Sequence, residues 1–263
     1  MRFASGILGI AAVMATVAVG GGFLGYRAGV ASAMHAIVGI SSPGDRVIPL
    51  MRYAVGADGF HGLYGQDLWV LNTVFPGVKN GFFLDIGSAD GTEISNTKRL
   101  ETEGWSGICV DPFPRNMADR TCAVYSQAVA GESGRAIKFH GPGTYGGGIV
   151  DFAGWWVGKD EKSKAVEMTT ATIADILQRA GAPQFIHYMN VDIEGAEYDA
   201  LQAFPFDRYT VGSLTIEHNN LEERRIQLRN LFESNGYRIE WALRDQDWYV
   251  HDQARDAART AGR

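Results

Sequence analysis

The sequence predicts an α/β protein with a mostly parallel sheet and helices on both of its faces, preceded by one N-terminal transmembrane helix. Strand-like and helix-like segments alternate along most of the chain, an order that gives a parallel sheet covered by helices. The chain has 263 residues, of which 46% are hydrophobic, and this suffices for one sizeable packed domain with appendages. Residues 3–26 contain no charged side chain.

This uncharged run is long enough to cross a bilayer, which takes roughly 20 apolar residues as a helix. A cleaved signal peptide is the alternative, because Ala31-Ser32-Ala33 imitates the small-residue pattern of a cleavage site. However, only Arg2 precedes the run, and the run exceeds the roughly 7–15 apolar residues of a signal sequence. We therefore expect residues 1–30 to be a retained anchor and residues 31–63 a linker.

The expected anchor has one face that suits a partner helix. Gly21, Gly25 and Gly29 recur every four residues, and small residues at this spacing let a second transmembrane helix approach closely. The alternative is that small residues are simply abundant in this segment.

Charge predicts the orientation of the anchor and excludes one class of partner. Arg27 and Arg46 follow the run, whereas Arg2 alone precedes it, and positive charge marks the cytoplasmic side. We therefore expect a single-pass membrane protein with its C-terminal domain in the cytoplasm. The net charge is −6, so a nucleic-acid partner is not expected.

The elements of the main domain, expected over residues 64–250, follow in order. The first is an amphipathic helix from Gln66 to Phe75, with apolar side chains on one face. The expected strands are Phe82–Ile86, Gly107–Asp111, Ala123–Ala130, Phe185–Val191, Ser213–Glu217 and Trp248–Val250. The expected helices are Ser95–Glu103, Thr172–Ala180, Glu194–Ala203 and Leu221–Asn235. Residues 251–263 lack an apolar period and are expected to form a loose tail.

The stretch from His140 to Lys164 does not fit this alternation. It is rich in glycine and contains Trp155 and Trp156, so we expect a loop that covers the acceptor site or rests on the membrane surface. The alternative is that both tryptophans fill the core.

The cysteine content argues against a disulfide scaffold, because the chain has only Cys109 and Cys122. Cys109 lies inside the apolar run Gly107–Val110, so its expected role is that of a small core residue.

The turn after the first expected strand suggests a bound cofactor. The chain leaves this strand through Asp85-x-Gly87-x-x-x-Gly91, at the sheet edge where open α/β sheets bind ligands. It lacks the G-x-G-x-x-G pattern of nicotinamide cofactors, which disfavours a dinucleotide oxidoreductase. Asp111 ends the second strand, where an acid can accept bonds from ribose hydroxyls. Alternatively, the glycines only shape a turn and Asp111 caps a helix.

Several segments within residues 64–250 carry a more specific pattern. They are YGQD at Tyr64–Asp67, FFLDIGSADG, ISNT, GWSGICVDPFPRN, TATIADIL, YMNVDIEGAEYDAL, TIEHN and DWYV. In this order they resemble the FkbM-type S-adenosylmethionine-dependent methyltransferases. Residues 1–63 lie outside the resemblance.

The resemblance implies a Rossmann-like class I methyltransferase fold and S-adenosyl-L-methionine as cofactor. It implies that Asp85, Gly87 and Gly91 surround the methionine part and that Asp111 binds the ribose. It also implies a hydroxyl acceptor on a sugar, a lipid or a metabolite, which the sequence does not identify further. The candidate cofactor-binding residues are Asp85, Gly87, Ser88, Gly91, Asn96 and Asp111.

Two further strand ends supply candidates for the chemistry. Transfer to a hydroxyl needs the acceptor aligned with the methyl group and its proton removed by a base. Asp192 and Glu194 follow the strand Phe185–Val191 and are expected to face the cofactor, although acids here can also stabilise a helix dipole. Glu217 and His218 end the next strand, and His218 is either a general base or a structural hydrogen-bonding group.

Asp192, Glu217 and His218 are together a possible set of ligands for a divalent ion that lowers the pKa of the acceptor, but nothing in their spacing requires a metal, and none is predicted. We therefore expect a membrane-anchored O-methyltransferase that uses S-adenosylmethionine. The alternative is an accessory or structural subunit of a membrane complex, docked through the glycine face and carrying a methyltransferase-like domain.

Overall fold

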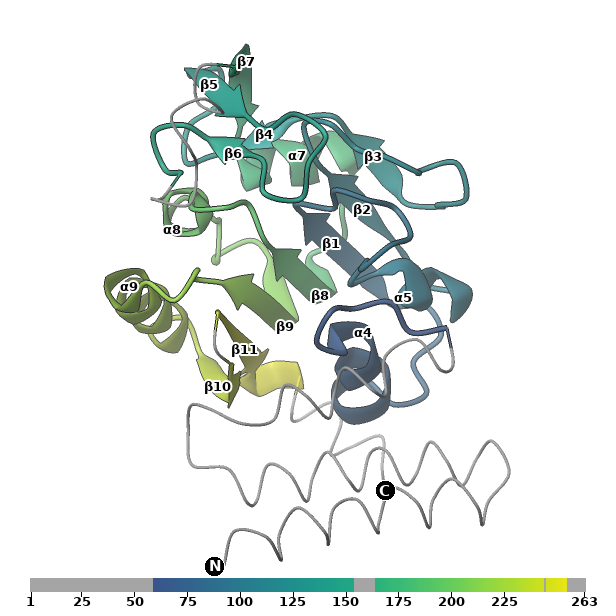
Figure 1. The fold of residues 1–263 in the computed structure, drawn as a ribbon. Helices are drawn as coiled ribbons and strands as arrows, with labels where there is room; N and C mark the ends of the chain where they lie inside the picture. The colour runs from purple at the N-terminus through teal and green to yellow at the C-terminus, as the bar shows by residue number, and fades with distance from the viewer. Residues whose placement is uncertain (1–58, 154–163, 244, 255–263) are drawn as a thin grey trace, which may run out of the picture.

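The computed structural model of the protein describes residues 59–153, 164–243 and 245–254 (Figure 1). The expected anchor with its glycine face, nearly all of the expected linker, and the pair Trp155 and Trp156 lie outside these residues. Within the described ranges, no helix has both the length and the apolar character needed to cross a membrane.

The core of the fold is a seven-stranded sheet in the order β10-β11-β9-β8-β1-β2-β3 (Figure 1). Five adjacent strands, from β9 to β3, are parallel, and β11 is antiparallel to both of its neighbours, β9 and β10. The prediction of a mostly parallel sheet is therefore confirmed. The strands are β1 (Phe82–Ile86), β2 (Ser106–Val110), β3 (Ala123–Tyr125), β8 (Phe185–Val191), β9 (Thr210–Glu217), β10 (Tyr237–Ala242) and β11 (Gln246–His251).

Helices pack on both faces of this sheet, as predicted. Alternate residues of each strand point to opposite faces, so Phe83 and Leu84 belong to different hydrophobic clusters. The cluster around Phe83 includes α4 (Gln66–Trp69), the single-turn π-helix η1 (Val70–Val74) and α5 (Lys98–Thr102). The cluster around Leu84 includes α7 (Ile173–Ala180), α8 (Glu197–Gln202) and α9 (Glu222–Glu233).

A second sheet of four short strands, in the order β4-β7-β5-β6, was not predicted. It lies beyond the carboxyl ends of β1 and β2 (Figure 1). Its strands are β4 (Ala128–Val129), β5 (Ala136–His140), β6 (Gly148–Ile149) and β7 (Val166–Ala171). The single strand expected over Ala123–Ala130 is wrong, because the chain passes from β3 in the main sheet to β4 in the small one. At the crossing, the Gln127 N–H donates to the Asp111 carbonyl at 3.3 Å.

The expected core position of Cys109 is confirmed, but its disulfide was not predicted. Cys109 is fully buried on β2, but it forms a disulfide with Cys122, which lies just before β3. Because β2 and β3 are neighbouring parallel strands, with Ile108 opposite Ala123, the two cysteines meet across the ladder. The bond closes the loop that carries Asp111 and the residues after it.

The packed domain extends beyond residues 64–250 at both ends. Phe60 and Ala254 are 4% and 1% exposed and belong to the same hydrophobic cluster as Trp69. The first residues of the expected tail therefore pack against the core.

Candidate functional site

The turn after β1 has glycines because other backbone segments approach it closely. Gly87 has φ of +86°, and its N–H donates to the carbonyl of Val110 at 2.8 Å. A Cβ on Gly87 would lie 1.7 Å from the carbonyl oxygen of Asp192, and one on Gly91 would lie 2.4 Å from that of Asn116. These close backbone contacts are enough to explain why both positions are glycine, without any bound ligand.

Asp85 holds this turn to the neighbouring elements. Its carboxylate is buried and accepts from the Thr97 hydroxyl at 2.6 Å and from Asn190 Nδ2 at 3.0 Å. Burial raises the pKa of Asp85, although these hydrogen bonds and the positive charge of Arg120 lower it. Asn190 in turn accepts from Asn96 Nδ2 at 3.0 Å, so the network links β1, β8 and the segment before α5.

Asp111 follows β2 at the same edge of the sheet. Its two carboxylate oxygens accept the N–H groups of Ala89 at 3.0 Å and Phe113 at 2.7 Å, and this fixes the side chain beside the turn after β1. Burial raises its pKa, while these two hydrogen bonds lower it. Each carboxylate oxygen has a second lone pair that remains able to accept a further hydrogen bond.

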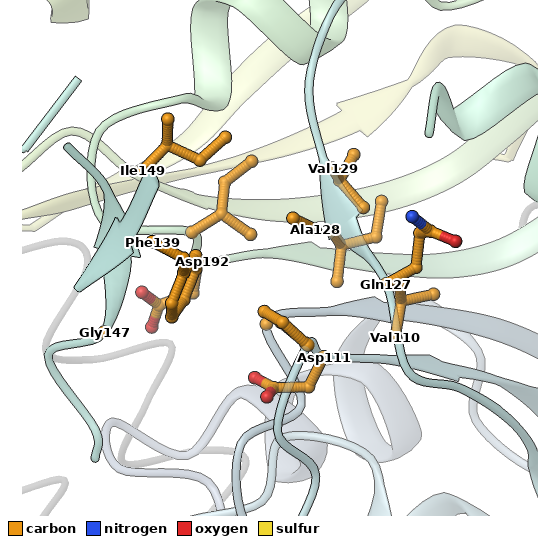
Figure 2. A pocket seen from close by; sticks show the side chains of 13 residues that line it. Val110, Asp111, Gln127, Ala128, Val129, Phe139, Gly147, Ile149 and Asp192 are labelled. Atoms are coloured by element: carbon orange, nitrogen blue, oxygen red, sulfur yellow. The ribbon is translucent and has the colours of Figure 1, made fainter. Parts of the chain in front are cut away.

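Two adjoining cavities open at this edge of the sheet, with volumes of about 30 and 210 Å³. Gly87, Asp111, Phe139, Gly147 and Asp192 line both. Figure 2 shows the smaller cavity, with Asp111 near Val110 and Asp192 near Phe139. The other walls of this smaller cavity are mainly apolar and include Ile86, Pro112, Ala128, Val129 and Ile149.

The larger cavity brings together most of the predicted site residues. Asp85, Gly87, Ser88, Asn96, Asp111, Asp192, Glu194 and Glu217 all line it. Ser88 is only 5% exposed, and its hydroxyl has no hydrogen-bond partner among the described residues. The Asn96 Oδ1 atom is likewise enclosed without one. Since an enclosed polar group without a partner is costly, these two atoms favour a polar ligand in the cavity.

Three carboxylates gather where β8 and β9 end. Oxygen atoms of Asp192, Glu194 and Glu217 lie within 4.8 Å of one another. Burial, followed by the repulsion of neighbouring acids, raises the pKa of Glu194 to about 8 and that of Glu217 far above its ordinary value. Burial also raises the pKa of Asp192, to about 6, although a hydrogen bond from Glu217 opposes the shift. These three carboxyl groups are termed the acid cluster below. Because of the raised pKa values of Glu194 and Glu217, the acid cluster retains protons at neutral pH.

The backbone of the β8–α8 turn presents Glu194 to the cavity. Glu194 has φ of +53°, in the left-handed region. The N–H groups on either side of it, from Ile193 and Gly195, donate to Glu197 Oε1 at 3.1 and 3.0 Å. Glu197 therefore supports this conformation as a buried cap, while Arg224 lies 3.6 Å from its other carboxylate oxygen.

His218 does not join this group. Glu217 ends β9 and lines the cavity, whereas His218 follows the strand and is directed to Asp247 on β11. Its Nε2 atom lies 3.7 Å from Asp247 Oδ1, and the residue is 2% exposed. The structure therefore gives His218 the surroundings of a structural residue, away from the predicted acceptor.

Part of the glycine-rich loop after β5 covers the larger cavity. Gly143, Thr144 and Tyr145 line it. The Tyr145 hydroxyl donates to Glu93 Oε2 at 3.1 Å, and the Arg115 guanidinium lies 4.7 Å from the centre of its ring. The loop thus forms a wall of the cavity, and the two tryptophans expected in it lie outside the described residues.

Sequence reasoning missed several residues of this cavity. Asn190 could have been found, because it lies two residues before Asp192 and so faces the same side of the sheet. Glu93 and Ile94 come from the loop after β1, which meets the other walls only in the folded chain. Tyr145 lies in the glycine-rich loop that was expected to cover the acceptor site. The other missed lining residues include Leu63, Phe113 and Phe139.

Comparison with known proteins agrees with this geometry. Residues 85–239, well over half of the chain, match the methyltransferase FkbM domain, and this range includes every predicted site residue. No curated protein and no solved structure matches the chain significantly. The chain belongs to the FkbM methyltransferase family.

Proposed function

We propose that the protein is an S-adenosylmethionine-dependent methyltransferase that transfers the methyl group to a hydroxyl of its acceptor. The observation that carries this proposal is the junction of the two cavities. A mainly apolar slot with a carboxylate at the end of β2 opens directly into a larger cavity that contains the acid cluster. Family membership supports methyl transfer, and the cavities indicate where each reactant would bind.

The residues present fit this cofactor. Asp111 keeps lone pairs that can accept hydrogen bonds from ribose hydroxyls, and the apolar residues that line the smaller cavity can pack against one side of a planar base. The enclosed Ser88 hydroxyl and Asn96 carbonyl oxygen suit the charged amino-acid end of the molecule. Gly87 and Gly91 would act indirectly, because the absence of a side chain lets the backbone at Asp192 and Asn116 approach the turn after β1. Asp85 would act by accepting hydrogen bonds from Asn190 and Thr97.

The chain's own residues would position the acceptor and take its proton. When bound, the cofactor supplies a methyl group on a sulfonium, whose carbon–sulfur bond breaks with its electron pair returning to sulfur. The acceptor oxygen forms the new bond to carbon, and its proton must pass to a base. Asp192 suits this role because its pKa of about 6 leaves it mostly ionised at neutral pH, while Glu217 holds a proton beside it.

Titration of the full chain with S-adenosylmethionine, S-adenosylhomocysteine and NAD tests the proposal. We expect the first two ligands to bind and NAD not to bind, since the chain lacks the dinucleotide turn. Asp192→Asn should keep S-adenosylhomocysteine affinity near wild type, because this residue serves the acceptor side. Binding of NAD alone would contradict the proposal.

We further propose that the uncharged residues 3–26 anchor the enzyme in a membrane. The support for this is the sequence run itself. Intact-mass measurement on protein extracted from membranes is the test, and a mature chain that begins at Met34 would overturn it. The side of the membrane is a separate matter. Arg27 and Arg46 favour the cytoplasm, whereas the Cys109–Cys122 disulfide favours an oxidising compartment.

A further inference from the structure

The larger cavity has acidic side chains but no basic ones among its described lining residues. Seven of the described residues that line it carry carboxylates, and none of those described is a lysine, arginine or histidine. Three of the seven are already satisfied. Asp85, Asp90 and Asp111 each accept at least two hydrogen bonds from neighbouring groups.

The acid cluster is not balanced in this way. Among the described residues, the hydrogen bond to it from outside comes from Asn219 Nδ2, which lies 3.4 Å from Glu194. The Oε2 atom of Glu217 is enclosed and has no partner in the described part of the chain. The nearby guanidinium of Arg224 is directed to Asn219 and Glu197, and it does not line the cavity.

A second observation, on a residue outside the acid cluster, indicates that this cavity binds a ligand. Ser88 is 95% buried, its hydroxyl has no partner among the described residues, and it lines the same cavity as the acid cluster. An enclosed hydroxyl without a partner costs about 1–3 kcal/mol, so a bound molecule that satisfies it is favoured. The acid cluster therefore stands in a cavity whose polar groups favour a bound ligand.

The spacing of the acid cluster suits a protonated amine. Three oxygens that lie within 4.8 Å of one another share a central point no more than about 2.8 Å from each. This is the length of a charged N–H···O hydrogen bond, and an ammonium group has three N–H donors to give. A phosphate or carboxylate in this position would instead add negative charge beside acids whose mutual repulsion already raises their pKa values, whereas a cation would relieve that repulsion.

We propose that the acceptor is a hydroxyl compound that carries a protonated amine, and that the acid cluster holds this amine beside the hydroxyl to be methylated. The inference rests on the proposed function, because it names the substrate class of the same site. It excludes acceptors whose reacting end carries a phosphate or a carboxylate.

Three small hydroxyl compounds of different charge test this inference. The full chain is first saturated with S-adenosylhomocysteine and is then titrated with ethanolamine, ethylene glycol or glycolate at constant ionic strength, with binding followed by calorimetry or NMR. We expect ethanolamine to bind at least about tenfold more tightly than ethylene glycol, and glycolate to bind most weakly. Equal binding of the three, or preference for glycolate, would overturn the inference.

Matched variants locate the effect. The double change Glu194→Gln with Glu217→Gln should reduce ethanolamine binding to the level of ethylene glycol. Glu167→Gln removes one negative charge from an exposed strand residue and should change nothing. If the double variant fails to fold, the wild-type comparison of the three compounds still decides.

Titration with magnesium chloride tests whether the acid cluster binds a metal ion in place of an amine. If magnesium binds and these two substitutions abolish it, while ethanolamine does not bind, the positive group is a metal and the inference is wrong. The first step also separates the two proposals. Failure of S-adenosylhomocysteine to bind contradicts the proposed function, whereas normal cofactor binding without amine preference contradicts this inference alone.

Discussion

The carbonyl oxygen of Asp192 occupies the space that a side chain on Gly87 would need, since a Cβ there would lie only 1.7 Å away. The turns after β1 and β8 therefore touch through bare backbone. This contact sets the position of Asp192 relative to Asp111, and so places the acid cluster beside the proposed cofactor site.

Gly87→Ala should destabilise the domain severely, by roughly 3 kcal/mol or more, because it combines a backbone clash with an unfavourable positive φ. Gly134→Ala is the matched control. Gly134 has a φ of +76° but no atom within 4 Å of an added Cβ, so its replacement should cost only about 1 kcal/mol. Urea unfolding of both variants measures the difference. Equal costs would show that the contact with Asp192 is unimportant.

Asp111→Asn should weaken the binding of S-adenosylhomocysteine by about tenfold or more. The change removes the charge that strengthens hydrogen bonds from ribose hydroxyls, which are worth about 1.5–3 kcal/mol when the acceptor is charged. Asp119→Asn removes the same charge from an exposed residue of the same loop and should leave affinity unchanged. Calorimetric titration compares the variants, and an unaffected Asp111→Asn protein would remove Asp111 from the cofactor site.

The stability of the protein should depend on pH through Glu194. Burial raises its pKa from 4.5 to about 8, so the folded state holds a proton that the unfolded chain releases at lower pH. The stabilising contribution is complete below about pH 4 and is lost as the pH rises through about 8. Glu194→Gln should therefore be close to wild type near pH 5 and exceed it near pH 9 by up to roughly 4 kcal/mol, at about 1.4 kcal/mol for each pKa unit. Thermal unfolding of wild type and Glu194→Gln between pH 5 and pH 9 measures this difference.

Glu103→Gln, followed in the same way, provides a contrast of opposite sign. A hydrogen bond from Lys79, together with Arg99, lowers the pKa of Glu103 to about 2. Its contribution is present above the unfolded pKa of about 4.5 and is lost as the pH falls through about 2. This variant should be less stable than wild type near pH 5 and near pH 9 alike. A Glu194→Gln protein that behaved in the same way would contradict the assigned burial of Glu194.

The disulfide should stabilise the domain, and its presence in cells should indicate the compartment in which the domain lies. Cys109 and Cys122 are 13 residues apart, and closing a loop of this size stabilises a protein by about 3 kcal/mol. The double change Cys109→Ser with Cys122→Ser should lower stability by about that amount. Intact mass under non-reducing conditions, with and without thiol labelling, reports whether the bond forms in cells. Two free thiols in the native protein would place the domain on the reducing side.

Sequence patterns predicted the elements that depend on local periodicity. The strand Phe185–Val191 was predicted with its observed bounds, and α7 begins after Thr172, whose hydroxyl accepts the Asp175 N–H as an N-cap does. The small sheet was missed because its strands are short, and β7 carries mostly polar or exposed side chains. Such strands are stabilised by pairing with distant segments, which no local pattern records.

The candidate site was predictable where strand ends determine it and not where loops do. Asp111 follows β2 and Asp192 follows β8. These two strands flank β1 in one parallel sheet, so both residues are expected at its carboxyl edge. In contrast, Tyr145 meets Glu93 across 52 residues of sequence, and only the folded chain brings them together.

A crystal structure of the full chain with S-adenosylhomocysteine tests the central claim most directly. The account predicts ribose hydroxyls bonded to Asp111, the base among the apolar residues of the smaller cavity, and the sulfur directed to Asp192 and the acid cluster. A ligand whose ribose does not contact Asp111, or whose sulfur points away from Asp192, would contradict it.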